Sequence, residues 1–138
     1  MPNDLVFLDA NILVRAARSQ SNKLRRLWNL PGADLCTSAY AAEESRRNTP
    51  DPHRRAWLEE LLSAVRVIRE MGRTSPLPLG IELAEKDRPI LAAAIEAGAT
   101  HLVTADRRHF GGLYETTVSG VCILPPSLYL SSKEPSEP

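Results

Sequence analysis

Short, uninterrupted runs of apolar residues recur along this 138-residue chain, each bounded by polar or turn-forming residues. Such runs predict strands that are buried on both faces, as in a parallel sheet. The predicted strands are residues 5–8, 35–37, 101–103 and 121–124, and the brief alternation of apolar and polar residues at 65–68 indicates a further strand. Helical spacing of apolar residues predicts helices at 11–18, 22–30, 57–65 and 89–97, and a further one that Ser38 caps and that ends near Arg47. Strands that alternate with helices indicate an α/β sandwich around a mostly parallel sheet.

The length of the chain fits one domain, and a chain of this size buries a core without disulfide bonds. We expect the folded domain to span residues 1–130. The remaining residues, 131–138, are polar and proline-rich, which is typical of a disordered tail. The segment 72–80 is rich in proline and glycine and predicts a loop.

The charge balance argues against binding of nucleic acid through a global field, because 17 basic and 17 acidic residues cancel. Any RNA contact must therefore come from local basic patches. The basic residues are 14 arginines and 3 lysines, and the arginine fork binds phosphate at two points. Two adjacent pairs, Arg46-Arg47 and Arg107-Arg108, are candidate RNA contacts. Surface solvation explains most paired arginines equally well, and GC-rich coding explains an excess of arginine.

The two cysteines, Cys36 and Cys122, each lie in an apolar stretch without a partner at metal-ligand spacing. They predict buried free thiols and a reducing compartment. No apolar run approaches the ~18 residues of a membrane span, and the N-terminus lacks the features of a signal peptide. We therefore expect a cytoplasmic protein that does not associate with a membrane.

Acidic residues follow two of the predicted strands. Asp9 closes the first strand, and Asp106 comes shortly after the fourth. Ligands bind at the carboxyl edge of parallel sheets, so both side chains are expected at that edge. Glu44 lies on the helix after the second strand, and Asp87 precedes the last predicted helix. Spacing alone does not bring Glu44 and Asp87 to the same edge.

Convergence of four carboxylates is electrostatically costly. Two unit charges ~4 Å apart repel by about 4 kcal/mol at an effective dielectric of about 20. Either some carboxyl pKa values rise, or a divalent cation neutralises the site. Ligand sets made only of oxygen favour Mg²⁺ or Mn²⁺ over Zn²⁺. A cation that holds a water beside a phosphate oxygen supports phosphodiester hydrolysis, which needs no Ser or Cys nucleophile.

Four short motifs occur in order between residues 5 and 110. They are Phe7-Leu8-Asp9-Ala10-Asn11-Ile12-Leu13, Thr37-Ser38 followed by Glu44, Asp87-Arg88-Pro89-Ile90-Leu91-Ala92-Ala93-Ala94, and Leu102-Val103-Thr104-Ala105-Asp106. Each motif alone is weak, but their order on an α/β pattern resembles the PIN-domain ribonucleases, in particular VapC-type toxins or their close relatives. The resemblance implies a three-layer α/β sandwich with a mostly parallel five-stranded sheet.

The resemblance also implies an activity. It implies Mg²⁺- or Mn²⁺-dependent endonucleolytic cleavage of single-stranded RNA by a homodimeric toxin, which an antitoxin protein restrains. The catalytic and metal-binding residues would be Asp9, Glu44, Asp87 and Asp106. Asn11 and Thr104 would support them through hydrogen bonds, although capping of the first helix is an alternative role for Asn11.

Two neighbouring glutamates are candidates for the same place in the site, and only their spacing from Ser38 distinguishes them. Glu43 adjoins Glu44, and only one of them can face the site. The pattern of the resemblance puts the acid six residues after Ser38, which favours Glu44.

One position departs from the family pattern. Many relatives have a further acid three residues after Asp106, where this chain has His109. The three histidines, His53, His101 and His109, lack the spacing of metal ligands. The missing acid supports a rival interpretation, a PIN-like module that binds RNA or protein without useful catalysis. Action on single-stranded DNA is a third interpretation.

Overall fold

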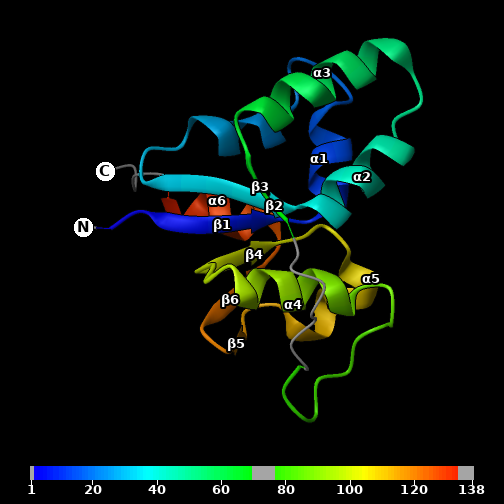
Figure 1. Ribbon diagram of the computed structural model, residues 1–138. Coiled ribbons are helices and arrows are strands. Elements are labelled where there is room, and N and C mark those ends of the chain that lie inside the picture. The colour runs from blue at the N-terminus through cyan, green and yellow to red at the C-terminus, as the bar shows by residue number, and fades with distance from the viewer. Residues whose placement is uncertain (1, 70–76, 134–138) are drawn as a thin grey trace.

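The structure is a computed structural model that describes residues 2–69 and 77–133 (Figure 1). Its strands are β1 (Asp4–Leu8), β2 (Ala33–Ser38), β3 (Arg66–Ile68), β4 (His101–Val103), β5 (Thr117–Val118) and β6 (Val121–Leu124). Its α-helices are α1 (Ala10–Ala16), α2 (Ala39–Arg47), α3 (Pro52–Ser63), α4 (Arg88–Glu96), α5 (Arg107–Phe110) and α6 (Pro126–Lys133), and its 3-10 helices are η1 (Lys23–Asn29) and η2 (Gly111–Leu113). The strands form one sheet in the order β3-β2-β1-β4-β6-β5.

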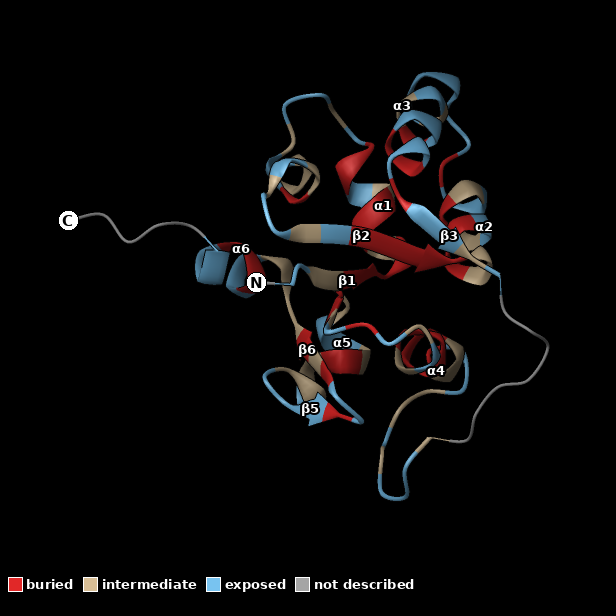
Figure 2. Ribbon diagram, turned by 60° about the vertical axis from the view of Figure 1, so that its left-hand side comes forward, coloured by how far each residue is buried: buried red, intermediate tan, exposed pale blue. Residues whose placement is uncertain are grey.

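Helices cover both faces of a sheet whose pairings are parallel except between β5 and β6. Strand β1 shows why its apolar run is continuous. Val6 and Leu8 pack on one face with residues of α1, η1, α3 and α6, whereas Phe7 packs on the other face with residues of α4 and α5. Figure 2 shows buried residues in β1, β2, α1 and α4. The predicted three-layer α/β sandwich is confirmed.

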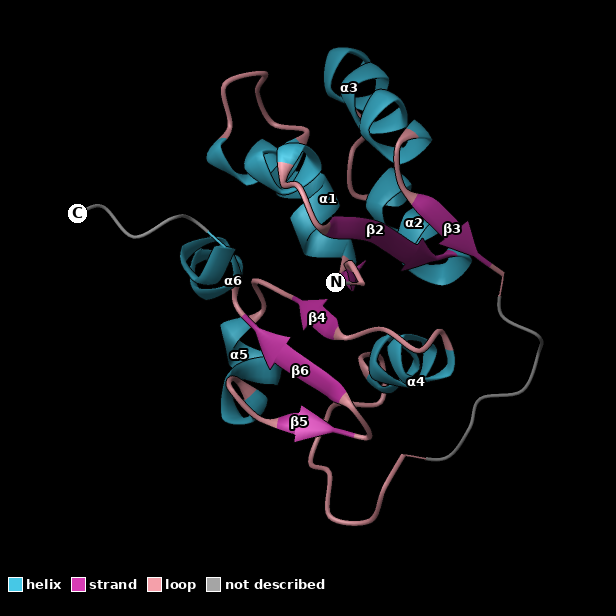
Figure 3. Cartoon of the chain, turned by 90° about the vertical axis from the view of Figure 1, so that its left-hand side faces the viewer, coloured by secondary structure: helices cyan, strands magenta, loops and turns pink. Residues whose placement is uncertain are grey.

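The sheet has six strands rather than the five that the resemblance implies. The additional strand is β5, which pairs antiparallel with β6 at one edge of the sheet (Figure 3). The two-residue turn between them holds Ser119 at φ 48° and Gly120 at φ 87°, the left-handed geometry of a tight hairpin. A strand of two residues has no periodicity to detect, so the apolar pattern does not predict it.

The predicted helices are present, with one change of type. The segment predicted as a helix over 22–30 forms the 3-10 helix η1. Asn22 caps it, because the Asn22 side chain accepts a hydrogen bond from the Leu24 amide at 2.9 Å and donates one to the Arg15 carbonyl at 2.6 Å. Of the predicted loop 72–80, residues 72–76 lie outside the described residues, and 77–80 form no helix or strand.

Two further expectations concern the cysteines and membranes. Both cysteines are free, with Cys36 buried and Cys122 half-buried. Burial raises the pKa of the Cys36 thiol to about 11, which leaves it unreactive at neutral pH. Within residues 2–69 and 77–133, no helix has the length and apolar character needed to cross a membrane.

The predicted disordered tail begins too early, because α6 continues through Lys133. The Lys133 ammonium lies 2.7 Å from Asp4 Oδ2 at the start of β1, and the Tyr129 hydroxyl donates to the same oxygen at 2.9 Å. These two contacts tie the last turn of α6 to the sheet, so residues 131–133 are ordered. Residues 134–138 lie outside the described part of the chain.

Removal of the contact between α6 and β1 should destabilise the fold. Tyr129→Phe should lower the free energy of unfolding by about 1.5 kcal/mol, because it deletes a hydrogen bond to a partly buried carboxylate. Burial acts to raise the pKa of Asp4, but hydrogen bonds from Lys133 and Tyr129 lower it below its ordinary value, so Asp4 is ionised at pH 7. Denaturant unfolding of Tyr129→Phe, Asp4→Asn and the double variant measures the coupling. Strictly additive losses would contradict a shared contact.

Candidate active site

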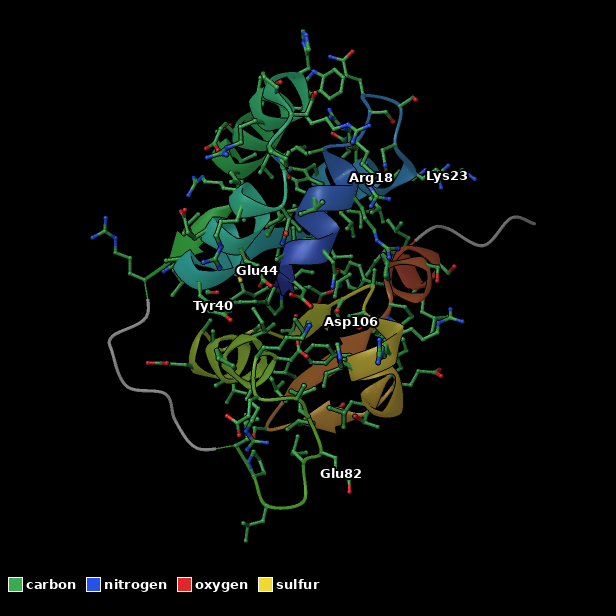
Figure 4. All side chains as sticks on the ribbon, turned by 90° about the vertical axis from the view of Figure 1, so that its right-hand side faces the viewer. Arg18, Lys23, Tyr40, Glu44, Glu82 and Asp106 are labelled. Atoms are coloured by element: carbon green, nitrogen blue, oxygen red, sulfur yellow. The ribbon has the colours of Figure 1, made fainter. Side chains whose placement is uncertain are left out.

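The carboxyl ends of β1 and β4 lie side by side, and a cleft of about 300 Å³ opens at this edge of the sheet. All four acidic residues predicted for the site line this cleft: Asp9, Glu44, Asp87 and Asp106. Figure 4 shows Glu44 and Asp106 on either side of the start of α1, with Arg18 beyond its other end. The fold therefore brings together four carboxylates that are separated by as many as 97 positions in the chain.

Asp9 is the most constrained of these acids, with only 5% of its surface exposed. It caps α1, because its Oδ1 accepts a hydrogen bond from the Ala10 amide at 2.7 Å. Its Oδ2 accepts from Thr104 Oγ1 at 2.8 Å and from Asn11 Nδ2 at 3.2 Å. Both residues predicted to support the site thus donate to this carboxylate.

Asn11 links two segments rather than capping α1. Its Oδ1 accepts a hydrogen bond from the Ala105 amide at 2.9 Å, in the loop after β4. The alternative role as a cap is wrong, because Asp9 occupies the cap position and Asn11 lies inside the helix. Asn11 therefore holds the loop after β4 against the start of α1.

Asp106 is held by its own helix. It caps α5, where Oδ1 accepts from the His109 amide at 3.1 Å, and Oδ2 lies 2.7 Å from His109 Nδ1. Burial acts to raise the pKa of Asp106, but the hydrogen bonds from His109 lower it overall. The Asp106 amide in turn donates to Thr104 Oγ1 at 3.1 Å, so Thr104 contacts both Asp9 and Asp106.

Asp87 has a buried carboxylate oxygen without a hydrogen bond. The residue is 8% exposed, and its Oδ2 accepts no hydrogen bond from any described residue. Burial, with the charge of Asp106, raises the pKa of Asp87 against the opposing effect of His109. A buried oxygen in this state needs a hydrogen-bond donor, a cation or a proton.

His109 lies with Asp87 and Asp106 in a group that could hold a metal ion. The spacing of the histidines in the sequence did not predict this. His109 Nδ1 lies 3.4 Å from Asp87 Oδ2, and one ligand atom from each of Asp87, Asp106 and His109 lies within 4.8 Å of the other two. The three-residue step from Asp106 to His109 puts both side chains on one face of the first turn of α5. Spacing between histidines could not reveal this, because the other two members are aspartates.

The electrostatics of the cleft fit a divalent cation. Burial raises the pKa of Asp9 to about 6, and the nearby charges of Asp87 and Glu44 add to the effect. Carboxylates that are buried, close together and incompletely hydrogen-bonded are the donor set that hard divalent cations bind. The residues present therefore fit a cation such as Mg²⁺ or Mn²⁺.

A comparison with family models matches the PIN domain over residues 5–108. The chain belongs to the PIN-domain family. The matched region includes all of β1 except Asp4, the strands β2 and β4, and all four acids of the cleft. The resemblance drawn from the four short motifs is thus confirmed.

Solved structures with this fold include VapBC2 from Rickettsia felis bound to a DNA fragment from their promoter, with a TM-score of 0.61, 19% identity, and coverage of 88% of this chain and 98% of that chain. VapBC-1 from nontypeable Haemophilus influenzae has a TM-score of 0.58, 14% identity, and coverage of 89% and 98%. VapC20 from Mycobacterium tuberculosis, a sarcin-ricin loop cleaving toxin, has a TM-score of 0.51, 13% identity, and coverage of 70% and 86%. These likenesses show a shared fold. No curated protein matches the sequence.

Within this PIN domain, the two neighbouring glutamates face different surroundings. Ser38 starts α2 by accepting a hydrogen bond from the Ala41 amide at 3.1 Å, and the helix then turns Glu44 toward the cleft. The side chain of Glu43 is 61% exposed and lies 3.5 Å from the Arg46 guanidinium. This arrangement supports the choice of Glu44.

The basic residues at the cleft differ from the predicted RNA contacts. Arg46 is held by Glu59, with Nε 2.9 Å from Oε2. None of the four predicted arginines, Arg46, Arg47, Arg107 and Arg108, is among the described residues that line the cleft, whereas Arg15, Arg18 and Lys86 are. Arg15 lies in the last turn of α1 and Arg18 just beyond its end, so these two arginines are not adjacent in the sequence, and a search for adjacent arginine pairs misses them.

Protonation of Asp9 should stabilise the metal-free PIN domain. Because its folded-state pKa of about 6 lies above the unfolded value of 3.8, folding binds a proton between these pH values. The contribution of Asp9 to the free energy of unfolding should therefore rise as pH falls from 7 to 4, by up to about 3 kcal/mol. Denaturant unfolding with a chelator, for the wild type and Asp9→Asn, measures it.

The difference in the free energy of unfolding between the wild type and Asp9→Asn isolates the contribution of Asp9, because the contributions of groups that titrate in both proteins cancel. Asp9→Asn should lack the gain in stability at low pH. Parallel stability curves between pH 4 and 7 would show that Asp9 ionises normally in the fold.

Proposed function

We propose that this protein is an endoribonuclease that hydrolyses phosphodiester bonds of single-stranded RNA with the aid of Mg²⁺ or Mn²⁺. The observation that carries the proposal is the convergence of four carboxylates in one cleft, two of them buried. Membership of the PIN-domain family supports nuclease activity. One solved structure with the same fold is a toxin that cleaves the sarcin-ricin loop, which supports RNA as the substrate.

The carboxylates of Asp9, Glu44, Asp87 and Asp106 would hold the cation. When bound, the cation supplies positive charge to a phosphate oxygen and lowers the pKa of a water. Thr104 and Asn11 keep Asp9 Oδ2 oriented as an acceptor through their hydrogen bonds. The described residues that line the cleft include no Ser, Thr or Cys, so we propose that water, rather than a side chain, attacks the phosphate.

The RNA backbone would follow the cationic side of the cleft. The cleft is lined by Arg15, Arg18 and Lys86 beside the carboxylates. These basic side chains would offset the repulsion between the carboxylates and the phosphates of RNA. A groove of about 170 Å³ shares Arg18 with the cleft and continues to Arg54 near the start of α3. Arginines along a groove neutralise successive phosphates without reading bases, which suits a single strand laid across the site.

We further propose that this ribonuclease is the toxin of a toxin–antitoxin pair. Two solved structures with the same fold are VapBC assemblies, which supports an antitoxin protein as partner. A partner that blocks the activity must cover the cleft and present positive charge to its carboxylates. The family also favours a homodimer and action in the cytoplasm, where cellular RNA is accessible.

Substitution of the two neighbouring glutamates gives a matched test of the site. Glu44→Gln and Asp9→Asn should each lower kcat/KM for a fluorogenic single-stranded RNA by about 100-fold or more, because each removes a charged oxygen ligand. Glu43→Gln changes the same side chain one position away, on the exposed face of α2, and should cleave like the wild type. Cleavage should require added Mg²⁺ or Mn²⁺ and stop with chelator.

The same experiment separates the nuclease from a binding module. RNA binding without cleavage under any metal condition would favour a PIN-like module, for which His109 in place of an acid is the specific support. Equal cleavage by the wild type and Asp9→Asn would overturn the proposed site. A single-stranded DNA substrate of the same sequence tests the third interpretation, and cleavage of DNA in preference to RNA would replace the proposed substrate.

Arg18→Ala should weaken RNA binding by about fivefold, through loss of one phosphate contact worth ~1 kcal/mol. The slope of log affinity against log salt should fall by about 0.7, the value for one contact to a single strand. Binding is measured by fluorescence anisotropy across salt concentrations, with a chelator present to prevent cleavage. Arg108→Ala serves as the control, because Arg108 is exposed and does not line the cleft. A larger loss in the control would move the RNA path to α5.

A further inference from the structure

We propose that His109 is a direct ligand of the cation held by Asp87 and Asp106, and that this nitrogen makes the site prefer Mn²⁺ over Mg²⁺. The inference rests on the proposed metal-dependent function and adds a residue and a metal preference to it.

Two distances within the cluster of Asp87, Asp106 and His109 are compatible with atoms that share one ion. Neighbouring ligands of an octahedral cation, each ~2.1 Å from it, lie about 3 Å apart. His109 Nδ1 lies 2.7 Å from Asp106 Oδ2 and 3.4 Å from Asp87 Oδ2. The three groups each offer one atom within 4.8 Å of the others, so a shared ion needs little movement of side chains.

The unsatisfied oxygen of Asp87 is an independent sign that the cluster takes a ligand. Asp87 Oδ2 is buried and accepts no hydrogen bond from the described residues. Buried carboxylate oxygens are otherwise hydrogen-bonded or paired. A cation between Asp87, Asp106 and His109 would satisfy it, whereas the contact between His109 and Asp106 alone does not.

The backbone holds the imidazole in position for this role. The His109 amide donates to Asp106 Oδ1 at 3.1 Å, which fixes the first turn of α5, and the His109 side chain is only 26% exposed. Neutral imidazole can coordinate through Nδ1 while its Nε2 carries the proton. An imidazole ligand raises affinity for first-row transition-metal ions relative to Mg²⁺, which prefers oxygen.

An orienting role for His109 is the competing explanation. In that case His109 Nδ1 would carry the proton and donate a hydrogen bond to Asp106 Oδ2, and only the carboxylates would touch the ion. Both roles predict lower activity when His109 is replaced, so activity cannot separate them. The presence of nitrogen in the coordination shell can.

In the test, Mn²⁺ is added to the 138-residue chain, and electron spin echo spectroscopy measures the coupling between the Mn²⁺ electron spin and any ¹⁴N nucleus that coordinates it. The wild type should show coupling from a coordinated nitrogen. His109→Asp, which replaces the imidazole by a carboxylate, and His109→Gln, which keeps a polar side chain of similar length, should both lose this coupling. His53→Gln is the matched control, because His53 is exposed near the start of α3, and its coupling should equal that of the wild type.

Metal affinities provide a second readout. The ratio of the Kd for Mg²⁺ to the Kd for Mn²⁺, from competition calorimetry, should fall by about tenfold in His109→Asp, since oxygen replaces nitrogen. If the wild type binds Mn²⁺ and cleaves RNA but shows no ¹⁴N coupling, or if the coupling persists in both His109 variants, the inference is wrong and the proposed function stands. If the wild type binds neither ion, the metal-dependent function fails as well.

Discussion

A hydrogen bond between neighbouring strand ends organises the acidic cleft. Thr104 Oγ1, just after β4, donates to Asp9 Oδ2, at the end of β1, over 2.8 Å. The parallel pairing of the two strands sets this contact, because Asp9 extends the ladder through its amide to the Val103 carbonyl. Thr104 also accepts from the Asp106 amide, and Asn11 holds the following loop. One threonine thus sets the relative positions of two of the four acids.

Four carboxylates lie in one cleft, and the hydrogen bonds of the described residues stabilise their negative charge only in part. Asp9 is buried with its pKa raised to about 6, and Asp87 has an oxygen without a hydrogen bond. Buried carboxylates that lie close together cost stability at this edge of the sheet, which is typical of a functional site. Arg15, Arg18 and Lys86 line the same cleft and supply positive charge beside the carboxylates.

The predictions from the sequence failed for two reasons. Some elements are too short to show a periodic pattern of apolar residues, and some contacts join segments that are distant in the chain. The two-residue strand β5 leaves no periodicity. Order through Lys133 depends on Asp4, at the other end of the chain. His109 joins Asp87 only because α4 and α5 start at the same edge. Residues 23–29 form a 3-10 helix, a choice of helix type that the spacing of apolar residues does not indicate.

The amino-acid sequence by itself determined the α/β class, the main strands and helices and the strand-end positions of Asp9 and Asp106, because burial on two faces and the ends of parallel strands leave a local signal. Asp9 and Asp106 were placed by that rule alone. Glu44 and Asp87 were selected by the resemblance to PIN-domain proteins. Only the tertiary structure decided that Glu44 and Asp87 reach the same cleft, that His109 joins them and that Arg15 and Arg18, rather than the arginine pairs, line it. The physical reason is that a binding site is a set of distances between side chains. Those distances follow from the packing of helices on the sheet, which spacing along the chain does not specify.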